Sequence, residues 1–201
     1  FPTRRSSDLL DVTGKPLFDK RLPIKDFASV AGTVILKDKI IVLSQMQDEK
    51  NKMIAQIDVL DGAGTIKSTY KIADPAHNII AGDLVVNADA TTLTIAAMTG
   101  DAKDKDAMYT VLYRMGLDGK ILSRREFLPG VSTRIEELQR MGNGQIIGAG
   151  RMRIDKEREA GWFLQVSRQG DLILQRPYPR GGQAQFKKIV DDRQGGFYAL
   201  G

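Results

Sequence analysis

The single histidine, His77, is the first residue to consider for catalysis, because a histidine beside a carboxylate can act as a general base. Asp74 lies three residues before it, in the segment ADPAHN. Nucleophilic catalysis would also need a presented nucleophile, and the sequence contains no Gly-x-Ser-x-Gly turn. An Asp-Pro pair is typical of a turn. We therefore interpret His77 as part of a loop that enters a strand, and we predict no catalytic residue.

Three aspartates, Asp101, Asp104 and Asp106, could supply oxygen ligands for a calcium ion. Their spacing is not that of an EF-hand loop, and Lys103 and Lys105 would repel a cation. We therefore interpret this segment as a solvated loop. With one histidine and no cysteine, the chain alone cannot form a cage of histidine and thiolate ligands for zinc. We predict no metal site and no cofactor.

A third polar group consists of Arg134, Glu136 and Arg140 in the segment TRIEELQRM. The residue types also suit a helix, but the corresponding positions of the repeat described below are strands, which favours a strand here. Alternate residues of a strand share a face, so these side chains could contact a ligand together or simply face water. The next segment, GNGQIIGAG, contains Gly-x-Gly but precedes no predicted helix, so it does not indicate a phosphate-binding loop.

The composition is that of a globular protein, with 42% hydrophobic and 27% charged residues. No apolar run approaches the roughly 20 residues that a membrane-spanning helix needs. Residues 111–201 are the basic part, with 16 Lys and Arg against 10 Asp and Glu. The charges alternate in sign, as in RIDKERE, which is typical of a solvated surface and makes nucleic acid an unlikely partner. The absence of cysteine leaves the compartment open.

The chain contains an internal repeat in which a short turn precedes a strand of alternating apolar residues. The turns are anchored by Gly14, Gly64, Gly119 and Gly170, at intervals of 50, 55 and 51 residues. Glycine suits this position because tight hairpin turns often need a positive φ. A second turn follows each anchor by 24 or 25 residues, at 37–39, 87–89, 142–144 and 194–196.

A charged stretch completes the unit, beginning at Gln47, Asp101 and Arg153. Each unit therefore contains four short strands joined by a tight turn, a charged loop and a glycine turn. Four antiparallel strands in a unit of about 50 residues are typical of a β-propeller blade. A β-helix would need shorter parallel coils, and a sandwich about seven strands per module. The charged loops would share one rim.

The sequence thus predicts an all-β fold, a partial β-propeller with about three complete four-stranded blades and partial blades at both ends. The complete blades are expected at 28–72, 77–128 and 132–178. The last strand of another blade is expected at 15–22, and the first hairpin of the next at 186–201. Propellers close with four or more blades, so we expect the native protein to continue past both ends and to hold about six to eight. The first strand of each blade lines the central channel, which makes Arg134, Glu136 and Arg140 the predicted ligand-binding cluster.

The repeat resembles a family of bacterial propeller repeats with units of the form W-L-v-k-l-d-x-x-G-n-i-l-w followed by D-G-G-y-i-l-a-G. The segment GWFLQVSRQGDLILQRPYP (161–179) matches the first half, and TRIEELQRMGNGQIIGAG (133–150) and FKKIVDDRQGGFYALG (186–201) match the second. The chain is more distantly similar to quinoprotein-type propellers. It has TGKPLF where those repeats have TGKxLW, and Trp162 is its one tryptophan.

The first nine residues, FPTRRSSDL, resemble a translated short-read sequencing adapter, as in a metagenomic assembly, and we exclude residues 1–9 from the predicted domain, 10–201. A natural basic arm carrying Arg4 and Arg5 is the alternative. We expect the native N-terminus, with any signal peptide, to be missing.

Our leading hypothesis is a non-enzymatic, rigid platform that binds a protein or a polymer, in a periplasmic or extracellular location. The apolar runs predict no membrane span. Two alternatives stay open. The chain could be part of a propeller enzyme, a hydrolase or quinoprotein-like, with its active site in missing blades or a fused domain, or it could be an envelope assembly scaffold. We also expect the unmatched blade edges to make the chain self-associate.

Overall fold

The computed structural model describes residues 6–10, 13, 15–21, 28–100, 108–192, 194 and 196–201. Within this part of the chain there are sixteen strands and no helix. The strands form three four-stranded antiparallel sheets and two two-stranded ones. The predicted fold class, an all-β partial propeller with about three complete blades, is therefore confirmed.

The three complete blades follow one another in the sequence, and each is a simple meander in which consecutive strands pair. The first blade contains β3 (Ser29–Leu36), β4 (Lys39–Gln47), β5 (Met53–Asp61) and β6 (Ile66–Ile72). The second contains β7 (Asn78–Val86), β8 (Thr92–Gly100), β9 (Tyr109–Gly116) and β10 (Ile121–Phe127). The third contains β11 (Thr133–Arg140), β12 (Ile146–Arg153), β13 (Glu159–Val166) and β14 (Leu172–Tyr178). The segment TRIEELQRM is a strand, as predicted.

Two hairpins flank the blades. An N-terminal hairpin pairs β1 (Ser6–Leu10) with β2 (Pro16–Arg21), and a C-terminal hairpin pairs β15 (Lys188–Asp191) with β16 (Phe197–Leu200). Strand β1 lies mostly in the adapter-like segment, residues 1–9. Its backbone nevertheless pairs with β2, a pairing that any short extended segment can make, since every residue except proline carries a donor and an acceptor.

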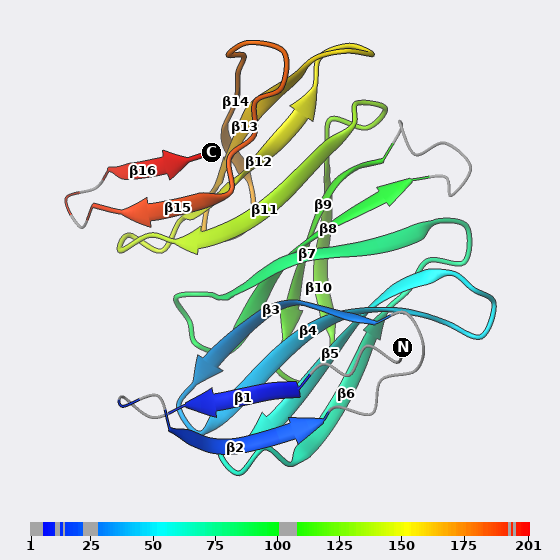
Figure 1. Ribbon diagram of the computed structural model, residues 1–201, viewed down its shortest axis with the longest axis vertical. Coiled ribbons are helices and arrows are strands. Elements are labelled where there is room, and N and C mark those ends of the chain that lie inside the picture. The colour runs from blue at the N-terminus through cyan, green and yellow to red at the C-terminus, as the bar shows by residue number, and fades with distance from the viewer. Residues whose placement is uncertain are drawn as a thin grey trace.

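The first strands of successive units lie side by side and form the inner edge of the assembly. β3 contacts β7, β7 contacts β11, and β11 contacts β15, and Figure 1 shows these four strands in succession along the long axis of the molecule. The fourth strands, β6, β10 and β14, lie at the outer edge; β10 and β14 are largely exposed, and β6 is exposed at alternate residues. The sheets thus radiate from a shared inner edge, as propeller blades do.

The hydrophobic core lies between neighbouring blades, because each sheet is apolar on both faces. Strand β13 shows this alternation: Trp162 and Leu164 pack toward the second blade, while Phe163 packs toward the C-terminal hairpin. The Trp162 side chain is fully buried. The Phe163 ring stacks on Phe197 of β16 with ring centroids 4.5 Å apart. Successive side chains of a strand point to opposite faces, so one strand joins two interfaces.

The turns between the third and fourth strands have the predicted geometry. Gly64, Gly119 and Gly170 have φ values of 75°, 85° and 90°, which a side chain resists. Gly14 lies outside the described residues. An acidic or hydroxyl side chain closes each of these three turns; for example, Asp61 Oδ1 accepts the backbone N–H groups of Ala63 and Thr65. This is the turn chemistry that short polar side chains provide.

In the described part of the chain, no helix is long and apolar enough to cross a lipid bilayer.

Candidate functional site

A charged pocket of about 590 Å³ opens between the third blade and the C-terminal hairpin. Its walls come from β11, from the adjacent strand β12 and from the segment that leads into β15. The lining side chains are Arg134, Glu136, Arg151, Gln185, Lys187 and Lys188. Four of these six side chains are basic and one is acidic, so the pocket favours anions.

A β-bulge in β11 turns the Glu136 side chain into this pocket. The pairing of β11 with β12 jumps from Ile135–Gly150 to Glu137–Ala149, which leaves Glu136 as the extra residue. A bulge re-aims a side chain and disturbs the ladder locally. Gly150 allows the close backbone approach, since a Cβ there would lie 1.9 Å from the Arg134 carbonyl oxygen.

The same bulge occurs in the inner strands of the other two complete blades. In β3 the extra residue is Ala31, and in β7 it is Gly82. Only the third of these three blades therefore carries a charged side chain at the bulge, Glu136. This difference makes the end of the inner edge beside β15 chemically distinct.

Two arginines face each other across the strand pair that forms the pocket wall. Arg134 of β11 and Arg151 of β12 are register partners, an arrangement that like charges disfavour. Each is accompanied by a carboxylate: Arg134 Nε lies 3.0 Å from Glu136 Oε1, and Arg151 Nη1 lies 3.1 Å from Glu159 Oε2. The two carboxylates offset the repulsion between the guanidinium groups.

The Arg134 ion pair is imperfect. The Arg134 Nε atom is buried and has no hydrogen-bond partner among the described residues. Glu136 Oε1 is close by, but the two groups are not aligned for a hydrogen bond. Arg151, in contrast, donates hydrogen bonds to both carboxylate oxygens of Glu159. A buried donor left without an acceptor costs about 1–3 kcal/mol, so Arg134 Nε is an unsatisfied donor in this pocket.

The lysines of the pocket differ in their surroundings. Lys188 Nζ donates a hydrogen bond to Glu137 Oε1 at 2.9 Å, and this bond, with the attraction between the charges, raises the pKa of Lys188. Lys187 is exposed, and within the described part of the chain its ammonium group has no ion-pair partner. Lys187 therefore supplies the surplus positive charge of the pocket.

A series of carboxylates joins the inner strands behind the pocket. Asp83 Oδ2 accepts the backbone N–H of Leu138 at 2.8 Å, and Glu137 Oε2 accepts the backbone N–H of Ile189. Asp83 and Glu137 each follow the bulge residue of their strand, and each reaches the next inner strand. In β15, Lys188 occupies the position that Glu137 occupies in β11, one residue before the residue whose N–H is accepted. The residue at this position is therefore basic in β15 and acidic in β11.

Burial raises the pKa of Asp83 to about 6, although hydrogen bonds from the backbone N–H groups of Leu138 and Leu84 lower it. The neighbouring charge of Glu137 adds to the increase, and that of Lys188 opposes it. Asp83 therefore titrates near neutral pH at the interface between two blades.

The predicted cluster of Arg134, Glu136 and Arg140 is divided by the structure. Arg134 and Glu136 lie in the pocket, but Arg140 does not line it and is exposed near the far end of β11. The bulge is the reason, because one extra residue reverses the alternation and places Arg140 on the opposite face of the sheet from Arg134.

Sequence reasoning missed Arg151, Lys187 and Lys188. Arg151 belongs to the neighbouring strand, and only its register with Arg134 brings it into the pocket. Lys187 and Lys188 lie in the segment FKKIV, one unit further along the chain. An alignment of the units position by position would have singled out Lys188, where the two preceding units carry Glu137 and Asp83.

His77 lies in the loop that precedes β7, as predicted. Asp74 Oδ1 accepts the backbone N–H groups of Ala76 and His77 and lies 3.4 Å from His77 Nδ1. Asp74 therefore shapes the turn. Asp101, Asp104 and Asp106 lie outside the described residues. Within residues that the structure does describe, no group of three histidine or carboxylate side chains could hold a metal ion.

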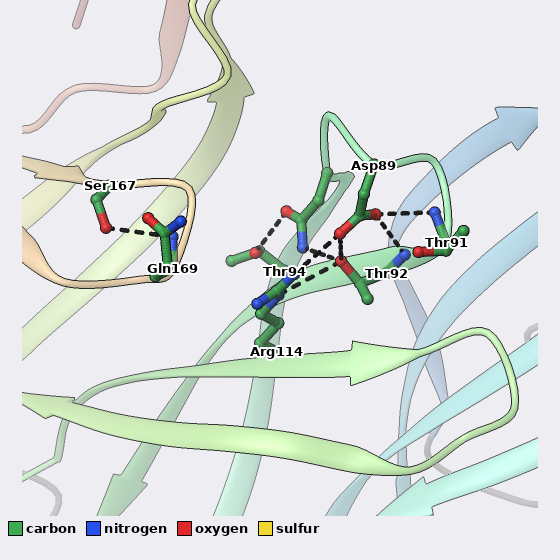
Figure 2. A network of polar contacts seen from close by, with 8 residues as sticks. Asp89, Thr91, Thr92, Thr94, Arg114, Ser167 and Gln169 are labelled. Atoms are coloured by element: carbon green, nitrogen blue, oxygen red, sulfur yellow. Dashed lines mark hydrogen bonds and ion pairs between the residues drawn. The ribbon is translucent and has the colours of Figure 1, made fainter.

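The most connected polar network has a structural role (Figure 2). Asp89 Oδ1 accepts the backbone N–H groups of Thr91 and Thr92, and Asp89 Oδ2 accepts bonds from the Thr92 hydroxyl and from Arg114. Burial raises the pKa of Asp89, but these hydrogen bonds together outweigh it and lower the pKa. Asp89 thus has an ample set of donors and fixes the turn between β7 and β8, in contrast to the poorly matched pair in the pocket.

Comparisons with known proteins add little to this description. No family model matches the sequence, and no curated protein matches it. Among solved structures, a crystal structure of the eukaryotic initiation factor matches with 10% sequence identity and a TM-score of 0.48. The match covers 83% of this chain and 36% of that chain, so this chain spans about a third of the length of the protein it resembles. A likeness of this extent identifies no function.

Proposed function

We propose that this chain is part of a rigid, non-enzymatic propeller platform that binds a protein or a polymer through the basic pocket beside β15. One observation carries the proposal: Arg134, Arg151, Lys187 and Lys188 gather around one opening. Arg134 also presents a buried donor without an acceptor. Unmatched donors in a concave site are typical of a place where a ligand binds.

The rigidity of the platform supports this role. Arg134 and Arg151 stand on paired strands rather than on loops, and the Phe163–Phe197 stack and Glu137 connect the third blade to the C-terminal hairpin. Binding groups on rigid strands lose little conformational entropy when a ligand arrives. No further ordering of the inner strands is needed for the pocket to form.

The kind of propeller to which the chain belongs is part of the same proposal. Its support is the sequence pattern of residues 133–150, 161–179 and 186–201, which resembles bacterial propeller repeats and, more distantly, quinoprotein-type repeats. An envelope assembly scaffold would use the same pocket for a protein partner. A propeller enzyme remains the rival from another class, with an active site that this sequence would not contain.

A binding screen tests the proposal. The chain is immobilised and exposed to soluble peptides and polysaccharides of both charges, and the ligands that bind are recovered and analysed. We expect saturable binding of acidic ligands that is lost in Lys187→Gln and kept in Arg158→Gln, which removes the same charge from an exposed loop. Binding that does not depend on Lys187 would contradict the proposed site.

A further inference from the structure

We infer that the basic pocket takes a carboxylate group of its ligand, and that Glu136 occupies the place of that carboxylate in the free protein. This inference rests on the proposed binding function and names the ligand chemistry and the residue that competes with it. It starts from the geometry of Glu136, whose carboxylate lies 3.0 Å from Arg134 Nε without making a hydrogen bond.

Glu136 is free to leave this position at little cost. As the bulge residue it has no partner in the β-ladder, so its side chain can move without disturbing the pairing of β11 with β12. Its side chain is 24% exposed and already borders the opening.

The charges around the pocket favour an anionic ligand at this position. Three of the four cations have an acidic neighbour, since Glu136 accompanies Arg134, Glu159 accompanies Arg151 and Glu137 accompanies Lys188. Within the described residues, Lys187 alone of the four has none. The ligand carboxylate replaces the Glu136 carboxylate beside Arg134, so one carboxylate takes the place of another, and Lys187 adds an attraction that Glu136 does not offset.

The donors of the pocket suit the flat shape of a carboxylate. A guanidinium group can bind a carboxylate through two parallel hydrogen bonds, and such charge-assisted pairs are about twice as strong as neutral ones. Arg134 makes one poorly aligned contact with Glu136, and its side chain lines the pocket. Lys187 then supplies a mobile second charge at the rim.

A titration with a matched pair of small probes tests the inference. Glucuronate carries one carboxylate, and glucuronamide has the same skeleton with a neutral amide. The readout is the NMR chemical shift of the backbone amides of residues 134–137, 151 and 185–188 in the full chain at constant ionic strength. We expect localised, saturable shifts with glucuronate, with a dissociation constant in the millimolar range, and none with glucuronamide.

Three variants test the inference through the direction in which each changes the affinity for glucuronate. Glu136→Gln removes the competing carboxylate, so we expect it to tighten glucuronate binding at least about threefold, whereas Arg134→Gln should weaken binding about tenfold or more. Arg158→Gln is the charge-matched control and should leave binding unchanged. The fluorescence of the buried Trp162 checks that each variant is folded, and Lys187→Gln replaces Arg134→Gln if the latter fails this check.

Each outcome separates the two proposals. Weaker or unchanged binding in Glu136→Gln would overturn the role of Glu136, even if the platform binds ligands through Lys187. Equal or tighter binding of inorganic phosphate than of glucuronate, or equal binding of glucuronamide, would overturn the assignment to a carboxylate. A screen in which no ligand depends on Lys187 would contradict the platform itself, which the glucuronate titration does not decide.

Discussion

Asp83 of the second blade accepts the backbone N–H of Leu138 of the third, with 2.8 Å between Oδ2 and the nitrogen. The contact joins two inner strands across a blade interface, one residue after the bulge in β7 and two residues after the bulge in β11. Glu137 repeats it one blade later by accepting the N–H of Ile189. The inner edge is therefore held by side chain to backbone contacts as well as by apolar packing.

The stability of the chain should depend on the ionisation of Asp83. Its pKa of about 6 in the folded state is above the unfolded value of 3.8, so the folded state binds more protons between these values. The contribution of Asp83 is therefore fully present below pH 3.8 and is lost as the pH rises through 6. The Asp83→Asn side chain cannot ionise. The free energy of unfolding of this variant should therefore rise relative to that of the wild type by at most about 3 kcal/mol between pH 4 and pH 7.5.

Urea unfolding of both proteins across this pH range measures the difference in free energy of unfolding. Asp74→Asn is the control, because the pKa of Asp74 is lowered and not raised. A difference between wild type and Asp83→Asn that stays constant from pH 4 to pH 7.5 would show that Asp83 has an ordinary pKa.

Glu137→Gln should loosen the C-terminal hairpin. The variant weakens the bond to the Ile189 N–H and removes the charge opposite Lys188, so we expect a loss of about 1–3 kcal/mol, confined to β15 and β16. Hydrogen exchange of the amides of residues 188–200 measures it. Glu157→Gln, an exposed residue of the loop between β12 and β13, should leave that exchange unchanged.

Two glycine variants should separate strain from collision. In Gly170→Ala the only penalty is the positive φ, because the new Cβ would lie 3.9 Å from the nearest atoms. The free energy of unfolding should fall by about 1–2 kcal/mol. Gly119→Ala meets a similar φ and, in addition, a Cβ position 2.0 Å from the Tyr70 ring. Thermal unfolding should therefore show the larger loss for Gly119→Ala. Equal losses would mean that the Tyr70 ring moves aside freely.

The isolated chain should self-associate through the outer face of the C-terminal hairpin. Val190, Tyr198 and Leu200 lie on this face and are 51%, 67% and 59% exposed. Exposed apolar strands at an open edge promote association. Sedimentation velocity should show oligomers that Tyr198→Lys reduces and Ile35→Lys, an equally exposed change on β3, does not. A monomeric wild-type chain at high concentration would refute this prediction.

The fold followed from the sequence because its signals are local and repeated. The positive φ of Gly64, Gly119 and Gly170 and the alternation along β13 are set by neighbouring residues. The pocket did not follow, because it depends on a bulge. Simple alternation places Arg134 and Arg140 on one face of β11, and the extra residue Glu136 separates them. Register between strands likewise brings in Arg151, which no pattern within one strand indicates.

The inner-edge contacts run in one direction along the chain, and this direction sets an order for synthesis on the ribosome. Leu138 follows Asp83 by 55 residues, which corresponds to roughly 3 to 11 s at about 5–20 residues per second. The second blade is completed at Phe127 within that interval, before Leu138 and the N–H that Asp83 accepts have been synthesised. The inner-edge contact of a blade therefore forms only after the first strand of the next blade has been synthesised. Until then the nascent chain exposes one unformed blade interface.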